Sequence, residues 1–147
     1  MQEKIQIISD GSLDLSRELT RERDILVVPF YVSFDGETYL KEGVELDIRE
    51  FYQRMVDHPD VFPKTSMPSV DDYYQVFLPL AKQDVPMICI CITTKFSGSM
   101  QSATTARDMI LEEYPKARIT VIDAEINTVL QGLYVLEAVS YTHLRAH

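Results

Sequence analysis

MICICITTKFSGSMQSA, residues 87–103, passes from an apolar run into a turn and then into small residues that suit a helix. Its first part alternates in polarity and is rich in β-branched residues, as β-strands are. The turn at 97–99 has one glycine between two serines, and serine is a preferred helix N-cap. This stretch therefore predicts a strand that leads through a short turn directly into a helix.

Strands and helices are predicted to alternate along the rest of the chain. Apolar spacing predicts further strands over residues 5–9, 25–34 and 117–123, and helices over 13–19, 48–56, 70–81, 99–114 and 128–139. Such alternation with short connections is typical of an α/β domain with a mainly parallel sheet flanked by helices. Ligands bind such sheets beyond the carboxyl ends of the strands, where the turns at 9–12, 97–99 and 123–127 lie.

Prolines and capping residues refine these elements. Pro29 lies within the strand 25–34 and has no N–H to donate, which predicts an edge strand or a strand with a break. Pro79 should kink the helix 70–81 or end it early. The spacing of a capping box occurs at Ser69 with Asp72 and at Thr128 with Gln131.

The helix 48–56 has the clearest amphipathic pattern. Asp47 precedes it and Glu50 follows three residues later, as a cap-like pair. The residues that form its single apolar face are Ile48, Phe51, Tyr52, Met55 and Val56.

Composition and charge exclude several classes of protein. The 147 residues carry a net charge of −9, which argues against a nucleic-acid partner because phosphate neutralisation needs a basic surface. No apolar run approaches the roughly 20 residues of a membrane span, and the first residues lack a signal-peptide core. Cys89 and Cys91 lie on one face of a strand, which predicts buried, reduced thiols. We therefore expect a cytoplasmic protein.

The last eight residues, SYTHLRAH at 140–147, do not continue the apolar pattern that precedes them. They carry two of the three histidines and no glycine stop. We interpret this tail as a cloning scar or a frame error that interrupts the last helix, and we expect the α/β domain to comprise residues 1–139.

Two loops with hydroxyl side chains are the candidate binding site. The segment PKTSMPS, residues 63–69, presents Thr65 and Ser66 between two prolines that stiffen a loop, and the turn at 97–99 presents Ser97 and Ser99 around Gly98. Hydroxyls beside the first amides of a helix suit an oxyanion. The alternative is that these serines only cap helices. Thr65 and Ser97 are the principal candidates, and the supporting candidates are Ser66, Gly98, Ser99 and Ser12.

Other site chemistries have less support. The aspartates at 10, 14, 35 and 123 show no repeated ligand spacing, so we expect solvated turns and no metal site. Ser97 and Ser99 have no evident base, and the chain has no G-x-S-x-G elbow. Gly98 is followed by serine and methionine, which excludes a Walker phosphate loop.

Six segments in order carry a resemblance that covers residue 5 to about residue 139. They read SDGSLDL, VVPFYVSFDGETY, DIREFYQRM, KTSMPSVDDY, TTKFSGSMQSA and VIDAEINTVLQGLYVLEA. With them the chain resembles the N-terminal domain of the DegV family of bacterial fatty-acid-binding proteins. The resemblance implies that one long-chain fatty acid is bound, with its carboxyl group held by Thr65 and Ser97, and that no other cofactor is needed.

The resemblance also implies partners and a missing part. Family members present the bound acid to the catalytic subunit of a fatty acid kinase and have no catalytic groups of their own. They are about twice as long, with a C-terminal domain that closes over the ligand and that this chain lacks. We therefore expect an exposed apolar face and self-association of the chain. The alternative function is an α/β enzyme that acts on a small phosphorylated or carboxylated substrate.

Overall fold

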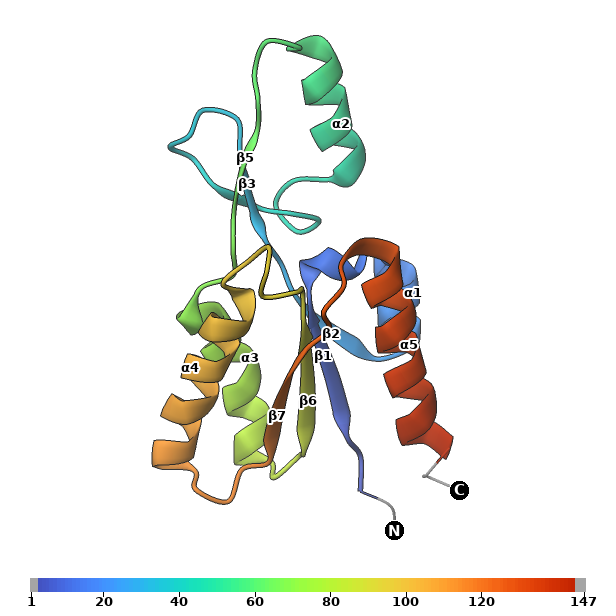
Figure 1. Ribbon diagram of the computed structural model, residues 1–147, viewed down its shortest axis with the longest axis vertical. Coiled ribbons are helices and arrows are strands. Elements are labelled where there is room, and N and C mark those ends of the chain that lie inside the picture. The colour runs from blue at the N-terminus through green and yellow to red at the C-terminus, as the bar shows by residue number, and fades with distance from the viewer. Residues whose placement is uncertain (1–2, 145–147) are drawn as a thin grey trace.

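A four-stranded parallel sheet forms the centre of the molecule, in a computed structural model that describes residues 3–144 (Figure 1). Its strand order is β2-β1-β6-β7, and every neighbouring pair is parallel. The strands are β1 (Gln6–Asp10), β2 (Ile25–Val28), β6 (Met87–Cys91) and β7 (Ile119–Asp123). The predicted α/β fold with a mainly parallel sheet is confirmed.

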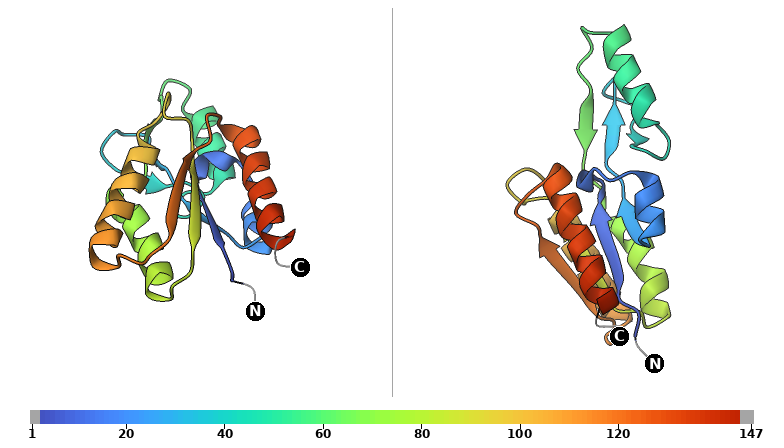
Figure 2. Two further views of the ribbon diagram at one scale, coloured as in Figure 1. Left: turned by 60° about the horizontal axis from the view of Figure 1, so that its bottom comes forward. Right: turned by 90° about the vertical axis from the view of Figure 1, so that its right-hand side faces the viewer.

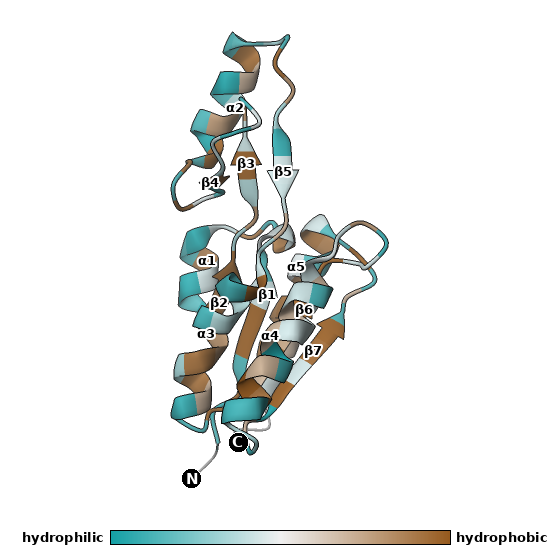
Figure 3. Ribbon diagram, turned by 90° about the vertical axis from the view of Figure 1, so that its left-hand side faces the viewer, coloured by the Kyte–Doolittle hydropathy of each residue, from teal (hydrophilic) through white to brown (hydrophobic). Residues whose placement is uncertain are grey.

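Helices cover both faces of this sheet. On one face lie α3 (Val70–Lys82) and α4 (Ser99–Glu113), and on the other lie α1 (Arg17–Glu22) and α5 (Thr128–Leu144) (Figures 1 and 2). Because successive strand residues point to opposite faces, Ile8 packs with Phe77 of α3 and its neighbour Ile7 packs with Val135 of α5. Figure 3 shows apolar segments in the middle of β1 and in β7, which contribute to these two cores.

A small lobe projects beyond the carboxyl ends of the main strands (Figures 1 and 2). It contains an antiparallel sheet in the order β4-β3-β5 and the helix α2 (Ile48–Asp57). Its strands are β3 (Tyr31–Ser33), β4 (Leu40–Lys41) and β5 (Lys64–Ser66).

One prediction about this region is confirmed, namely that Pro29 breaks the strand or places it at a sheet edge, and another needs correction. The predicted strand 25–34 breaks at Pro29 and Phe30 into β2, an edge strand of the main sheet, and β3, the central strand of the lobe. The predicted loop that carries Thr65 is instead the strand β5, whose Thr65 pairs with Val32. Proline provides no ladder hydrogen bond, so the chain can leave one sheet at Pro29 and enter another.

The helix ends also differ from prediction in several places. The predicted helix 13–19 is a 3-10 turn, η1 (Gly11–Leu13), followed by α1, which Ser16 caps by accepting from the Leu19 N–H. The helix α3 passes through Pro79 to Lys82, so the proline does not end it early. The helix α5 continues through the tail as far as Leu144, so the predicted interruption is wrong there. Residues 145–147 lie outside the described residues, and the origin of the tail stays a prediction.

The main sheet also contains the two cysteines. Both thiols are buried and free, as predicted, and their Sγ atoms lie 3.8 Å apart on one face of β6. No helix in the described part of the chain is long and apolar enough to cross a membrane.

Candidate functional site

The structure brings the two hydroxyl-bearing segments into contact. Thr65 lies in the middle of β5, and Ser97 lies in the loop between β6 and α4, beyond the carboxyl end of the main sheet. Met67 packs against Gly98, because a Cβ atom placed on Gly98 would lie only 2.8 Å from the Met67 sulfur. Met67, two residues after Thr65, therefore touches Gly98, which directly follows Ser97.

The loop before α4 presents several hydrogen-bond donors. Gly98 is the N-cap of α4. Because glycine has no side chain that could accept from the first amides of the helix, these amides face the loop. The Ser97 hydroxyl accepts a hydrogen bond from the Ser99 N–H at 3.1 Å, which leaves its own O–H available to donate. Thr65 and Ser66 are exposed, and Ser97 is half-buried. This arrangement suits an anionic oxygen.

Apolar side chains lie beside these hydroxyls. Phe96, next to Ser97, is 71% exposed, and Met67 is 44% exposed. Exposed apolar surface next to a set of donors fits a ligand with a charged head and an apolar body.

A buried carboxylate lies directly beneath this loop. Asp10, at the carboxyl end of β1, is completely buried and accepts hydrogen bonds from the Ile92 N–H, the Ser99 hydroxyl, the Gln131 amide and the Ser12 N–H, at 2.8, 2.8, 2.9 and 3.3 Å. Burial raises the pKa of Asp10, while these four donors act in the opposite direction. The prediction that Asp10 lies in a solvated turn is therefore wrong.

Two of the supporting candidates belong to this buried network. Ser99 is completely buried, and its hydroxyl bonds both Asp10 and the Tyr73 hydroxyl, so it supports the loop from inside. Ser12 is half-buried and contributes its backbone N–H to Asp10. Gln131 does not form the predicted capping box with Thr128, because its Oε1 has no hydrogen-bond partner among the described residues, while its NH₂ group donates to Ser9 and Asp10.

Sequence reasoning missed this network. The visible signal was a glutamine in the apolar pattern of residues 128–139, since a polar side chain on a buried helix face needs a polar partner. The capping box predicted at Ser69 and Asp72 does form, with both reciprocal hydrogen bonds present.

The other aspartates support turns, as expected. Asp35 accepts hydrogen bonds from the Glu37 and Thr38 N–H groups, each at 2.7 Å, and these bonds hold the pKa of Asp35 well below its usual value. Asp123 accepts from the Thr94 hydroxyl at 2.7 Å. The described residues contain no cluster of three or more side chains that could hold a metal ion.

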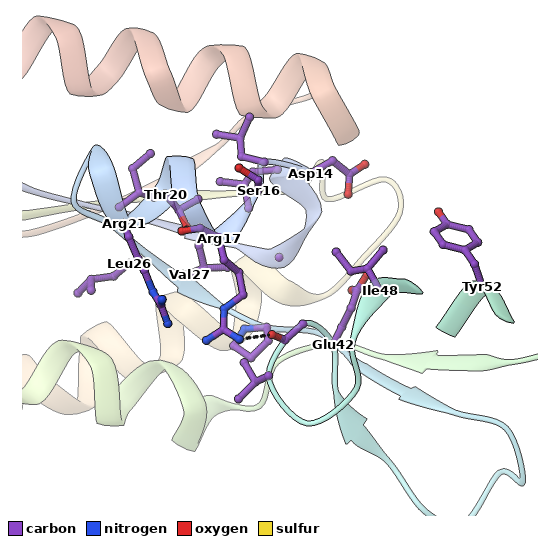
Figure 4. A pocket seen from close by; sticks show the side chains of 17 residues that line it. Asp14, Ser16, Arg17, Thr20, Arg21, Leu26, Val27, Glu42, Ile48 and Tyr52 are labelled. Carbon is purple, nitrogen blue, oxygen red and sulfur yellow. Dashed lines mark hydrogen bonds between the residues drawn. The ribbon is translucent and has the colours of Figure 1, made fainter. Parts of the chain in front are cut away.

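A hollow of about 450 Å³ lies elsewhere, between α1 and the start of α2 (Figure 4). Its walls include Leu26 and Ile48, and Arg17 crosses it to donate to the Gly43 carbonyl at 2.8 Å. Neither Thr65 nor Ser97 lines it. The hollow is therefore separate from the candidate head-group site.

Fold and site together define an α/β domain whose candidate binding groups gather at the carboxyl edge of a parallel sheet. The family model DegV, described as "Uncharacterised protein, DegV family", matches residues 4–143. The chain belongs to the DegV family. The match extends a few residues beyond the boundary at residue 139 that the sequence predicted.

Curated relatives share the family name. A DegV domain-containing protein from Caldanaerobacter subterraneus subsp. tengcongensis is 38% identical over 136 residues, which are 92% of this chain and 46% of the relative. Protein DegV from Bacillus subtilis is 30% identical over 136 residues, or 91% of this chain and 46% of the relative. The chain thus spans about half the length of these relatives.

Solved structures share the fold. A protein from Eubacterium ventriosum, described as a fat acid (stearic acid)-binding protein, is 48% identical with a TM-score of 0.93 over 95% of this chain and 48% of its own. DegV from Bacillus subtilis, described as a fatty acid binding protein, is 27% identical with a TM-score of 0.85 over 99% of this chain and 49% of its own.

Proposed function

We propose that this chain binds a long-chain fatty acid, with the carboxylate held by the hydroxyls of Thr65 and Ser97. The observation that carries the proposal is the 48% identity and the TM-score of 0.93 to a protein described as binding stearic acid. The contact between Met67 and Gly98 supports the assignment, because it joins the segments that carry both hydroxyls.

The chemistry of the site fits such a ligand. Removing a sixteen-carbon tail from water contributes about 0.8 kcal/mol per methylene, or roughly 12 kcal/mol before the entropy losses of binding. Each hydrogen bond to the charged head adds about 1.5–3 kcal/mol. Most of the affinity therefore comes from the tail, and the hydroxyls with the α4 amides fix the orientation of the head.

We further propose that the chain is a non-catalytic subunit in a cytoplasmic fatty acid kinase system. It presents the bound carboxylate to the catalytic subunit, which phosphorylates it to an acyl phosphate. The loop at residues 97–99 supports this role, because Gly98 is exposed and Ser97 is only half-buried, so a partner can approach the head group there.

Native mass spectrometry of the full chain purified from bacteria tests the ligand class. A bound mass equal to that of a C14–C18 acid supports the proposal. A bound nucleotide or sugar phosphate would contradict it and would support the alternative, an α/β enzyme for a small phosphorylated or carboxylated substrate.

Substitutions test the head-group assignment. Thr65→Ala and Ser97→Ala should each weaken binding by about 5- to 150-fold, and kinase-dependent phosphorylation should fall further because a rotating head is misplaced for attack. Ser102→Ala is the control, since Ser102 is a buried serine one turn into α4. Variants at 65 and 97 that melt lower but bind normally would show that these residues only stabilise the loops.

A further inference from the structure

The loop that carries Ser97 is held at both ends by one oxygen atom. Oδ2 of Asp10 accepts the Ile92 N–H at 2.8 Å, where the chain leaves β6, and the Ser99 hydroxyl at 2.8 Å, where α4 begins. These two donors bracket the whole loop of residues 92–99. The Ser99 N–H in turn donates to the Ser97 hydroxyl. Asp10 is therefore connected through Ser99 to the hydroxyl that we propose binds the ligand.

The second oxygen of Asp10 attaches the same group to the opposite side of the sheet. Oδ1 accepts from the amide of Gln131 in α5 and from the Ser12 N–H in the turn after β1. On the other face, the Tyr73 hydroxyl of α3 bonds Ser99. Asp10 is therefore held by α5, by the turn after β1 and by the loop 92–99, so a change at Asp10 also changes the position of that loop.

We propose that Asp10 is a positioning residue for the head-group site, where its buried carboxylate clamps the loop 92–99 and thereby places the Ser97 hydroxyl for the ligand. This inference rests on the proposed function. Asp10 itself is completely buried, so it acts on the ligand only through the loop.

The geometry distinguishes two substitutions of Asp10. Asp10→Ala removes the clamp and leaves the Ile92 N–H without an acceptor in a buried position. Asp10→Asn keeps one acceptor oxygen, which can stay on Ile92 and Ser99. Its new NH₂ group then replaces Oδ1, so the long 3.3 Å bond from the Ser12 N–H is lost. The same NH₂ group faces Gln131, whose buried Oε1 has no partner among the described residues and can accept from it after an amide flip.

Gln6 provides a matched control on the same strand. It is a buried polar residue at the opposite end of β1, where its amide donates to the Asp24 carbonyl at 2.7 Å. Gln6→Ala should lower stability by a similar mechanism to Asp10→Ala but leave the loop 92–99 in place.

The test uses the full chain, palmitate labelled with ¹³C at the carboxyl carbon, and three measurements: binding titration, thermal melting and the carboxyl resonance of the bound acid. Asp10→Ala should weaken binding about 10-fold and shift the bound resonance. Asp10→Asn should restore binding to within about threefold, and Gln6→Ala should melt lower with affinity and resonance unchanged.

Each failure has a distinct meaning. If wild type binds no palmitate, the proposed function fails, and this inference with it. If wild type binds and Asp10→Ala only melts lower, with affinity and resonance unchanged, the inference alone is overturned.

If Asp10→Ala does not fold, Ser99→Ala decides the question, with Ser102→Ala as its control in the same helix. Weaker binding and a shifted resonance for Ser99→Ala alone support the clamp, whereas wild-type values for both variants overturn it.

Discussion

The helices α2 and α3 have the same sequence pattern but different surroundings. Both begin at a capping residue and repeat apolar residues at helical spacing. In α3 this face is in the core, with Tyr73 and Phe77 completely buried, whereas α2 has no buried residue, and Tyr52 is 59% exposed. The comparison teaches that periodicity predicts which face of a helix is apolar, but not what covers it.

The cause lies in the layers beneath the two helices. The helix α3 packs on the four-stranded sheet beside α4, so its apolar face meets a complete layer. The helix α2 belongs to the small lobe, where Phe51 packs on Phe34 with ring centroids 5.6 Å apart and Arg54 lies over the same Phe34 ring. A sheet of three very short strands covers only part of one face.

The largest expected effect comes from truncating equivalent apolar side chains in the two helices. Phe77→Ala should lower the free energy of unfolding by about 3–5 kcal/mol, because it removes a completely buried ring and leaves a cavity. Tyr52→Ala should change it by at most about 0.5 kcal/mol, as for other surface substitutions. Urea unfolding of both variants checks this. Equal losses would mean that α2 is covered in solution by something that buries Tyr52.

Two glycines, one in the main domain and one in the small lobe, allow the same comparison for the backbone. Here the expected loss of stability is smaller. A Cβ atom on Gly132 of α5 would lie 2.4 Å from the Leu13 carbonyl oxygen, so Gly132→Ala should force α5 away from η1 at a cost of about 1–3 kcal/mol. Gly43 in the lobe has no atom within 4 Å of such a Cβ but has a φ of +73°. Gly43→Ala should therefore cost only about 1 kcal/mol of backbone strain.

Thermal melting of the two glycine variants distinguishes these causes. Gly132→Ala should lower the melting temperature clearly more than Gly43→Ala does. The reverse order would show that the lobe, and not the contact between α5 and η1, limits the stability of the fold.

Patterns within short stretches of sequence correctly predicted individual elements and local hydrogen bonds. The strand, turn and helix of residues 87–103 are confirmed, and so is the capping box of Ser69 and Asp72, whose two partners lie three residues apart. Thr128 and Gln131 have equally good spacing, but Gln131 bonds Asp10 instead, 121 residues away. A hydrogen-bond partner so far away in the sequence cannot be predicted from the spacing of residues.

For the candidate site, the sequence could indicate segments but not their surroundings. Residue types alone marked the segments of Thr65 and Ser97, and the fold brings these segments together through Met67 and Gly98. The strand β5 was missed because its pairing partner, β3, appears only once the chain breaks at Pro29. Asp10 was misplaced because a carboxylate after a strand is usually solvated, and its four donors come from separate elements.

The smallest expected effect concerns the link between the two regions. The Tyr31 hydroxyl in β3 donates to both carboxylate oxygens of Asp72, at 2.9 and 3.0 Å, and Asp72 caps the start of α3. Tyr31→Phe should therefore cost about 1 kcal/mol near pH 8, measured by urea unfolding. Tyr52→Phe, at an exposed tyrosine of the same lobe, is the matched control and should leave the free energy of unfolding unchanged at that pH.

This link should also weaken at high pH. Partial burial and the hydrogen bond to Asp72 raise the pKa of Tyr31 to about 12, above its ordinary value of 10.0. The folded protein therefore keeps the Tyr31 proton over a range in which the unfolded chain loses it. The stabilisation is complete below pH 10 and is lost as the pH rises through about 12. The stability difference between wild type and Tyr31→Phe should shrink over that interval, and a constant difference would show that Asp72 does not hold the lobe through this hydroxyl.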